Sequence, residues 1–108
     1  MIKYMNNLFF ATKVSFLNEM KLLSDKVGVD WSDAIEGFIL DGRIGHSHLA
    51  VPGPDGDLGF GGHCLPKDVS ALVNGYDDME LLQVVLQVND KVRKNRDWEK
   101  MKGRAVVE

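Results

Sequence analysis

Residues 2–27 read IKYMNNLFFATKVSFLNEMKLLSDKV, and this stretch decides the fold class. Mostly apolar side chains recur three or four positions apart along it: Met5, Leu8, Phe9, Thr12, Phe16, Met20, Leu23 and Val27. This spacing predicts one long amphipathic helix. Gly28 follows it, and glycine commonly ends helices. Only Met1 precedes the helix and no natural N-cap is present, so we expect that the helix continues from a preceding part of a longer protein.

Shorter helices are predicted over residues 31–40, 66–74 and 77–98. Asp30 resembles an N-cap for the first of them, and Asp33 lies in its first turn. Pro66 suits the first position of the second, where a missing N–H costs nothing, and Gly75 ends it. The pair Asp77 and Glu80 resembles a capping box for the third. The expected buried stripe of that helix is Leu81, Leu82, Val85, Leu86, Val88 and Val92.

The sequence therefore predicts an all-α domain over residues 1–101, with one long N-terminal helix and three or more shorter ones. Residues 102–108 change character and resemble a turn that enters a β-strand. A strand without a partner is not stable alone. We therefore expect residues 102–108 to begin a further domain.

Composition excludes several classes of protein. The 108 residues carry a formal net charge of −3 with an isoelectric point near 5.5, which argues against a general nucleic-acid binder. No apolar run approaches the roughly 20 residues of a membrane span, and no signal peptide is evident. The single cysteine excludes an internal disulfide. These features predict a soluble, cytoplasmic protein.

Residues 41–65 form a long glycine-rich stretch between helices. Loops longer than roughly 12–15 residues are uncommon in compact domains and are usually functional or disordered. Order is favoured here, because apolar side chains that could anchor the loop are spread along it: Ile44, Leu49, Val51, Leu58 and Phe60. A short helix is expected around residues 42–48.

The segment GFGGHCLPKD, residues 59–68, places Cys64 between glycines and a predicted helix start. Glycines let backbone approach a ligand closely. A helix N-terminus and the nearby Lys67 would stabilise a thiolate, and Asp68 could move protons or order a water. A lone cysteine is also commonly an inert small apolar residue, so a nucleophile and a packing role both stay open.

Two further constellations could contribute to a site. Lys3 and Asn7 are one helical turn apart, so they are either a solvated pair or donors to an oxyanion. Arg43, in the turn DGRIG of residues 41–45, could clamp a phosphate or form a surface salt bridge. Zinc is poorly supported, because there is no second cysteine and His46, His48 and His63 lack the usual spacing. The glycine run is not a dinucleotide fingerprint.

Four elements in this order resemble the nucleotide-sugar dehydrogenases, and among them the UDP-glucose 6-dehydrogenases: KYMNN at 3–7, SFLNE at 15–19, DGRIG at 41–45 and GFGGHCLPKD at 59–68. The resemblance covers nearly the whole chain. It implies the central helical domain of these enzymes, of the type found at the C-terminus of 6-phosphogluconate dehydrogenase. The flanking cofactor-binding and nucleotide-sugar-binding domains would lie outside this chain, which would then be inactive alone.

The family oxidises the sugar C6 alcohol to a carboxylate with two NAD⁺, so the resemblance implies roles for individual residues. Cys64 would be the nucleophile, with Lys3 and Asn7 at the C6 oxygen and Asp68 positioning water. Lys67 would reach the NAD cofactor, which the absent domain mainly binds. The implied contacts to the UDP-sugar are Phe60, Gly61, His48 and, from a neighbouring subunit, Arg43.

The chain also departs from the family pattern. His48 stands where many relatives have an aromatic residue, and the insertion of residues 54–57 lengthens the loop. GDP-mannose or another nucleotide sugar stays open as the substrate.

A stand-alone helical module without catalysis is the second hypothesis. In either case we expect a homodimer through the long first helix, which carries more apolar side chains than one face can bury: Phe9, Phe10, Val14, Phe16 and Leu17.

Overall fold

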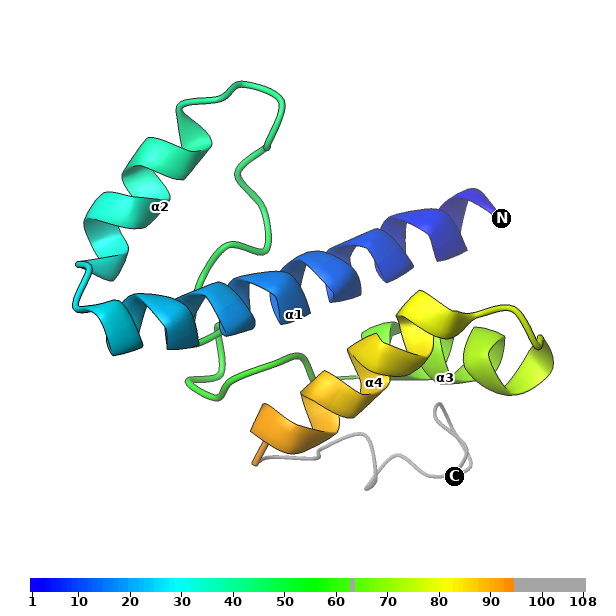
Figure 1. Ribbon diagram of the computed structural model, residues 1–108. Helices are drawn as coiled ribbons and strands as arrows, with labels where there is room; N and C mark the ends of the chain where they lie inside the picture. Colours follow the sequence, from blue (N-terminus) through cyan, green and yellow to red (C-terminus); the bar gives the residue numbers. More distant parts are fainter. Residues whose placement is uncertain (63, 95–108) are drawn as a thin grey trace.

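The computed structural model describes residues 1–62 and 64–94, and within these ranges it contains helices and no strands. The helices are α1 (Ile2–Val27), α2 (Trp31–Ile39), α3 (Cys64–Gly75) and α4 (Glu80–Val92). Figure 1 shows α3 and α4 on one side of α1, and α2 beside its C-terminal half. The prediction of an all-α domain is confirmed.

The end of α1 and the start of α2 follow the sequence signals. Gly28 takes the left-handed conformation, with φ at 79°, and its N–H donates to the Ser24 carbonyl. The Asp30 carboxylate accepts a hydrogen bond from the Asp33 N–H at 3.1 Å and so caps α2. Both predicted boundary residues are confirmed.

The bounds of α3 and α4 differ from the prediction. Cys64, not Pro66, begins α3, and Pro66 is tolerated because the first turn of a helix has no backbone acceptor for its N–H groups. Met79 is the N-cap of α4 without a side-chain cap bond, so the capping box of Asp77 was wrong. Arg93 is already extended, with ψ at 130°, which ends α4 before the predicted residue 98. Residues 95–108, including the predicted strand, lie outside the described part.

The connection between α2 and α3 consists of turns and bends. The short helix expected over residues 42–48 is absent, because Gly45 and His48 both have positive φ (79° and 61°), which interrupts helical hydrogen bonding. The expectation of an anchored loop holds, since Phe60 is buried in the core. The chain passes behind α1 on its way to α3 in Figure 1.

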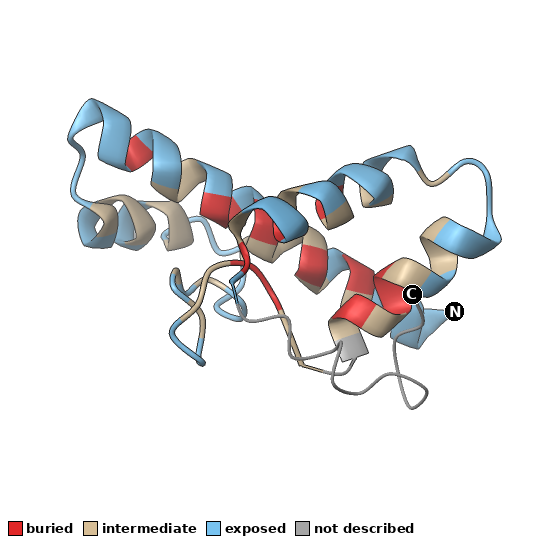
Figure 2. Ribbon diagram, turned by 90° about the horizontal axis from the view of Figure 1, so that it is seen from below, coloured by how far each residue is buried: buried red, intermediate tan, exposed pale blue. Residues whose placement is uncertain are grey.

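The core lies where α1, α3, α4 and the end of the glycine loop meet, as the buried residues in Figure 2 show. Its buried apolar members are Leu8, Ala11, Phe60, Val69 and Val85. Burying a side chain of this size contributes about 1.5–3 kcal/mol. The core therefore fixes Phe60 against the helices just before α3 begins.

The buried face of α1 includes Leu8 of the apolar stripe predicted from the sequence, but it otherwise differs from that stripe. Small and polar residues such as Ala11, Ser15 and Asn18 are also buried on α1, and Asn18 accepts a hydrogen bond from the Gly59 N–H of the loop. Much of the predicted stripe is instead exposed: Met5 at 62%, Phe9 at 63%, Phe16 at 48%, Leu23 at 51% and Val27 at 64%. In α4, Leu81 was likewise expected to be buried and is 65% exposed.

Candidate active site

Two residues far apart in the sequence meet beside α3. The Asn7 side-chain amide on α1 donates to a carboxylate oxygen of Asp68 on α3 at 2.6 Å. The Asp68 side chain is almost fully buried, so this hydrogen bond compensates part of the cost of removing a carboxylate from water. Asn7 and Asp68, both predicted as site residues, are therefore brought together by the packing of α1 on α3.

Of the two lysines in the predicted site, Lys67 lies next to this contact. The Lys67 ammonium is 3.4 Å from the second carboxylate oxygen of Asp68, and its side chain is 30% exposed. Lys3 is exposed one helical turn before Asn7. Asp68 thus has an amide donor on one oxygen and an ammonium on the other.

Cys64 is the first residue of α3, one turn before Asp68. The N-terminus of a helix carries partial positive charge, which favours an anion there. His63 lies outside the described residues, and the placement of the thiol itself is not described. The only cysteine of the sequence therefore lies at the N-terminal end of α3. Asn7 contacts the same end of this helix through its hydrogen bond to Asp68.

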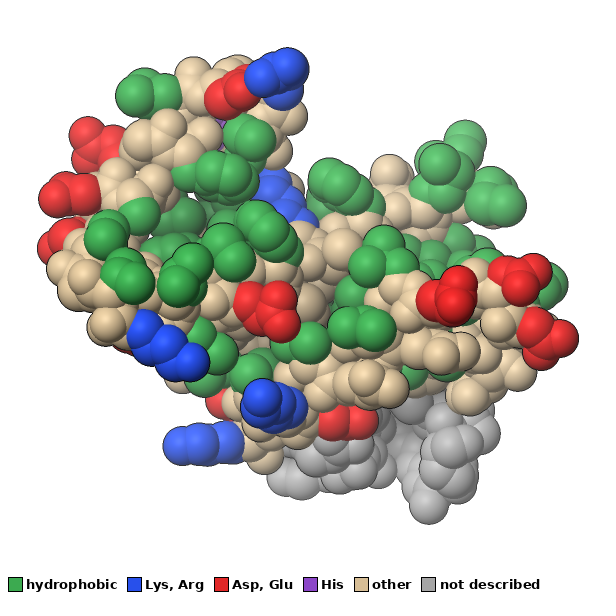
Figure 3. All heavy atoms as spheres, in the orientation of Figure 1, with side chains coloured by type: hydrophobic (Ala, Val, Ile, Leu, Met, Phe, Trp, Pro, Cys, Tyr) green, Lys and Arg blue, Asp and Glu red, His purple; other side chains and the backbone are tan. Residues whose placement is uncertain are grey.

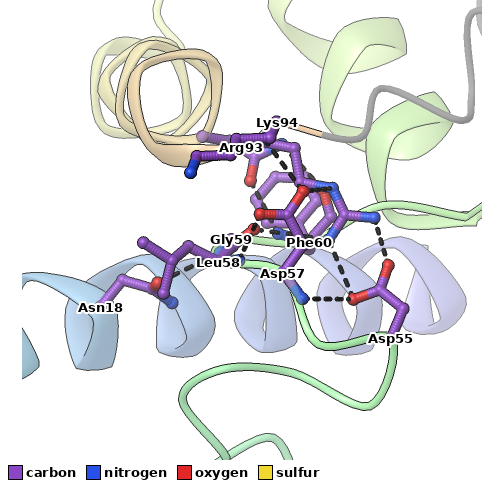
Figure 4. Close-up of polar contacts among 9 residues, drawn as sticks. Asn18, Asp55, Asp57, Leu58, Gly59, Phe60, Arg93 and Lys94 are labelled. Carbon is purple, nitrogen blue, oxygen red and sulfur yellow. Dashed lines mark hydrogen bonds and ion pairs between the residues drawn. The ribbon is translucent and has the colours of Figure 1, made fainter.

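Two buried asparagines hold the glycine loop that leads to Cys64. The Gly59 N–H donates to Asn18 Oδ1 at 3.1 Å, and the Phe60 N–H donates to Asn89 Oδ1 at 2.7 Å. Asn89 Nδ2 in turn donates to the Phe60 carbonyl at 2.9 Å. Figure 4 shows Asn18 reaching Gly59 from α1. Loop position is therefore set by side chains of two helices.

A second set of contacts ties residues 55–58 to the end of α4. The Arg93 guanidinium pairs with the Asp55 carboxylate and lies 3.7 Å from that of Asp57, and its side chain is only 1% exposed. The Lys94 N–H also donates to Asp57 at 2.9 Å. The hydrogen bond from Arg93 is the main reason why the pKa of Asp55 lies below its ordinary value. Figure 4 shows these groups converging around Arg93.

A pocket of about 900 Å³ opens between α1, α2 and the loop. Its lining includes three of the predicted substrate contacts, His48, Phe60 and Gly61. The His48 ring stacks on Phe10 with a centroid separation of 4.2 Å. Partial burial, and then the charge of Lys13, lower the pKa of His48, which favours the neutral ring. The pocket thus offers stacking, apolar surface and glycine backbone to a ligand.

Arg43 does not join the other predicted residues. Its side chain is 89% exposed and pairs with Asp41 at 2.5 Å, which is the surface salt bridge that the sequence left open. That hydrogen bond raises the pKa of Arg43 and lowers the pKa of Asp41. The Asp41 carboxylate takes hydrogen bonds from Nε and Nη2 of Arg43, so a phosphate bound by Arg43 would lie next to this carboxylate.

Other site classes find no support within residues 1–62 and 64–94. No group of three His, Cys, Asp or Glu side chains there could hold a metal ion. None of the helices in these ranges is both long and apolar enough to cross a membrane.

Sequence reasoning missed the residues that hold the loop. Asn18, Asn89 and Arg93 all look like ordinary polar positions, and only Asn18 fell within a quoted motif. A polar residue within an otherwise apolar helical stripe was the available signal, since such residues are buried only with partners.

Comparison with known proteins supports one family. The model of the UDP-glucose/GDP-mannose dehydrogenase family, central domain, matches residues 1–91. The chain is 41% identical to UDP-glucose 6-dehydrogenase TuaD of Bacillus subtilis over 98 residues, which cover 86% of this chain and 20% of that protein. It is 44% identical to a UDP-glucose 6-dehydrogenase of Rickettsia bellii over 93 residues, or 82% of this chain and 20% of that one.

The chain is also 40% identical to UDP-glucose 6-dehydrogenase AglM of Haloferax volcanii over 95 residues, which cover 83% of this chain and 21% of that protein. No solved structure matches the chain. The chain spans about one fifth of the length of these relatives. The match over residues 1–91 shows that this chain belongs to the UDP-glucose/GDP-mannose dehydrogenase family, to whose central domain it corresponds.

Proposed function

We propose that this chain supplies the cysteine-bearing central domain of a UDP-glucose 6-dehydrogenase, an enzyme that oxidises UDP-glucose to UDP-glucuronate with two NAD⁺. The observation that carries the proposal is the hydrogen bond between Asn7 and Asp68, one turn from Cys64. A general packing module would not need a carboxylate buried beside its only cysteine. The names of the matched relatives support the choice of reaction.

In this proposal Cys64 holds the substrate between two oxidations. Bound NAD⁺ would supply the hydride acceptor for each of the two oxidations at C6. The Cys64 sulfur adds to the aldehyde carbon, which gives a thiohemiacetal, and loss of the second hydride gives a thioester. Water then adds to C6, the C–S bond breaks, and the carboxylate leaves while the thiolate is restored. Covalent attachment prevents loss of the aldehyde.

Lys3 and Asn7 serve the oxygen on C6, which becomes negatively charged when the thiolate adds. A cation and an amide donor lower the free energy of such an oxyanion. Asn7 already donates to Asp68, so the side chains of Asn7 and Asp68 have a defined orientation before substrate binds. Asp68 accepts from Asn7 and can order the hydrolytic water.

The sugar nucleotide would lie over the glycine loop, in contact with Phe60, Gly61 and His48 from the pocket side. Lys67 is the one described residue that we propose to contact NAD⁺, and its side chain, 30% exposed, lies 3.4 Å from Asp68. NAD⁺ would otherwise be bound outside this chain, so we expect the 108 residues alone to be inactive. NAD⁺-dependent oxidation of a nucleotide sugar suits the cytoplasm.

We also propose a homodimer through α1. Its exposed apolar side chains follow spacings of three, four and seven residues, as in helices that pair along a seam: Ile2, Met5, Phe9, Phe16, Leu23 and Val27. Figure 3 shows hydrophobic side chains gathered along this face. Arg43, exposed on the α2–α3 connection, would reach the substrate of the partner.

The test is a chimera in which residues 1–91 replace the matching segment of the Bacillus subtilis relative TuaD. We expect NADH formation with UDP-glucose, and loss of it with Cys64→Ala. A folded chimera that oxidises no nucleotide sugar would contradict the proposal. Turnover with GDP-mannose but not UDP-glucose would favour the other substrate of the family.

The isolated chain provides the complementary experiment. It should form no NADH from UDP-glucose, and measurable turnover would refute our expectation that a cofactor-binding part is required. An inactive chimera combined with a stable dimer of the isolated chain would favour the non-catalytic module.

A further inference from the structure

The side chains of Asn18 and Asn89, which we call the asparagine clamp, hold the backbone of Gly59 and Phe60. Both amides are nearly inaccessible to solvent, with residue exposures of 3% and 2%. Neither residue belongs to the site inferred from the family resemblance. A buried amide contributes stability only when its donors and acceptors are satisfied, so the directions of these bonds are informative.

Each amide in the clamp has its orientation fixed by a donor contact. Asn18 Nδ2 donates to the Val14 carbonyl at 2.8 Å, which leaves Oδ1 to accept from Gly59. Asn89 Nδ2 donates to the Phe60 carbonyl, which leaves Oδ1 to accept from the Phe60 N–H. Asn89 therefore pairs with both backbone groups of one residue, as a neighbouring strand would. Such pairing fixes the orientation of the peptide as well as its position.

The fit of the clamp leaves no space at Gly59. A Cβ atom there would lie 2.2 Å from Asn89 Oδ1, and φ is +70°, a conformation that favours glycine. Gly62, by contrast, also has positive φ but has no atom within 4 Å of an added Cβ. Close contact with Asn89 thus distinguishes Gly59 from a glycine that is needed only for its backbone conformation.

The clamp lies directly before the proposed nucleophile. Phe60 is four residues before Cys64, and a tether of that length spans at most about 14 Å. On the other side, Asn18 belongs to the same helix as Asn7. The clamp therefore connects α1, which carries the oxyanion donors, to the backbone that leads into α3.

We propose that Asn89, supported by Asn18, is a positioning residue that sets how the glycine loop presents Cys64 at the start of α3. This inference rests on the proposed function in one respect, that Cys64 is the reacting group. Asn89 is not among the residues that line the pocket, and it acts through the backbone of Phe60.

The test measures alkylation of Cys64 by iodoacetamide in the 108-residue chain. Cys64 is the only cysteine, so every labelled molecule reports on it. Rate constants are collected from about pH 6 to about pH 10, a range that brackets the ordinary thiol pKa of about 8.5. We expect Asn89→Ala to move the apparent pKa by at least about half a unit, or threefold in thiolate fraction. Asn18→Ala should move it in the same direction.

Two control variants separate an effect on the position of Cys64 from a general loss of stability of the fold. Val85→Ala removes buried core packing one turn earlier on α4, from a side chain that packs in the same cluster as Phe60 but cannot hydrogen-bond to the loop backbone. Gln87→Ala removes an exposed amide from the same helix. Neither should change the pH profile, even where Val85→Ala lowers the melting temperature as much as Asn89→Ala. Equal profiles for Asn89→Ala and wild type, or an equal shift in Val85→Ala, would overturn the proposal.

If Asn89→Ala does not fold, Asn89→Asp takes its place under the same criteria. That variant keeps the acceptor for the Phe60 N–H and loses the donor to the Phe60 carbonyl. The experiment needs neither UDP-glucose nor NAD⁺, so an inactive chimera together with a shifted alkylation profile refutes the proposed function alone. An active chimera with an unchanged profile refutes the positioning role alone.

Discussion

Gly59 is the residue whose substitution tests the geometry of the loop most directly. Alanine in the left-handed region costs about 1–2 kcal/mol, and its Cβ would also collide with Asn89 Oδ1. We expect Gly59→Ala to lower the free energy of unfolding by a further 1–3 kcal/mol, roughly the cost of overpacking. Urea denaturation would measure the difference.

Gly56→Ala is the matched control for this prediction. Gly56 has a similar φ of +81°, but no atom lies within 4 Å of an added Cβ. It should therefore show the conformational cost alone. Equal losses in the two variants would mean that Asn89 moves aside freely and that the loop is not tightly held.

Asn7 offers a second test at the scale of single residues. Asn7→Ala would leave the buried Asp68 carboxylate without its amide donor, and such a loss costs about 1–3 kcal/mol. Asn6→Ala changes an exposed neighbour with the same gain in helix propensity, and should change stability by about 0.5 kcal/mol or less. Thermal unfolding of the two variants compares them. Similar stabilities would show that the contact with Asp68 contributes nothing net.

Between α4 and the loop, the pair of Arg93 and Asp55 predicts a pH dependence of stability. The hydrogen bond from Arg93 lowers the pKa of Asp55 in the folded chain. Between this lowered pKa and the pKa of the unfolded chain, the unfolded chain therefore binds more protons than the folded chain. Stability from this pair is full above the unfolded Asp pKa of about 3.9, and is lost as pH falls through the folded value. Asp55→Asn should therefore reduce the loss of stability on acidification below about pH 4.

A double-mutant comparison isolates this pair from the other carboxylates. In an Arg93→Met background, Asp55→Asn should no longer change the acid dependence of the melting temperature. An equal effect of Asp55→Asn in both backgrounds would assign the pH dependence to another partner.

Some of these elements were predictable from local sequence, and others were not. Gly28 and Asp30 mark the boundary between α1 and α2, because capping depends on neighbouring residues alone. The buried face of α1 could not be predicted, since periodicity identifies an apolar stripe without saying what covers it. Asp77 failed as a cap because the chain does not become helical until Glu80.

In the candidate site, too, some residues could be predicted from the sequence and others could not. The site residues proposed around Cys64 were predicted from a motif, and of these the structure shows a contact between Asn7 and Asp68. Asn89 and Arg93 were not found, because their function depends on the path of a loop whose backbone no local pattern describes. Long-range contacts between side chain and backbone are therefore the part of this site that required a structure.

For the whole molecule, the exposed stripe of α1 predicts assembly. Phe9 and Phe16 lie seven residues apart and are 63% and 48% exposed, so each would face a second copy across a twofold interface. We expect a dimer in light scattering at micromolar concentration, and a monomer after Phe9→Asp with Phe16→Asp, because the substitution places like charges opposite each other. Val84→Asp, an exposed apolar position on α4, is the control and should stay dimeric. A monomeric wild-type chain, or dissociation by Val84→Asp alone, would place the interface elsewhere or remove it.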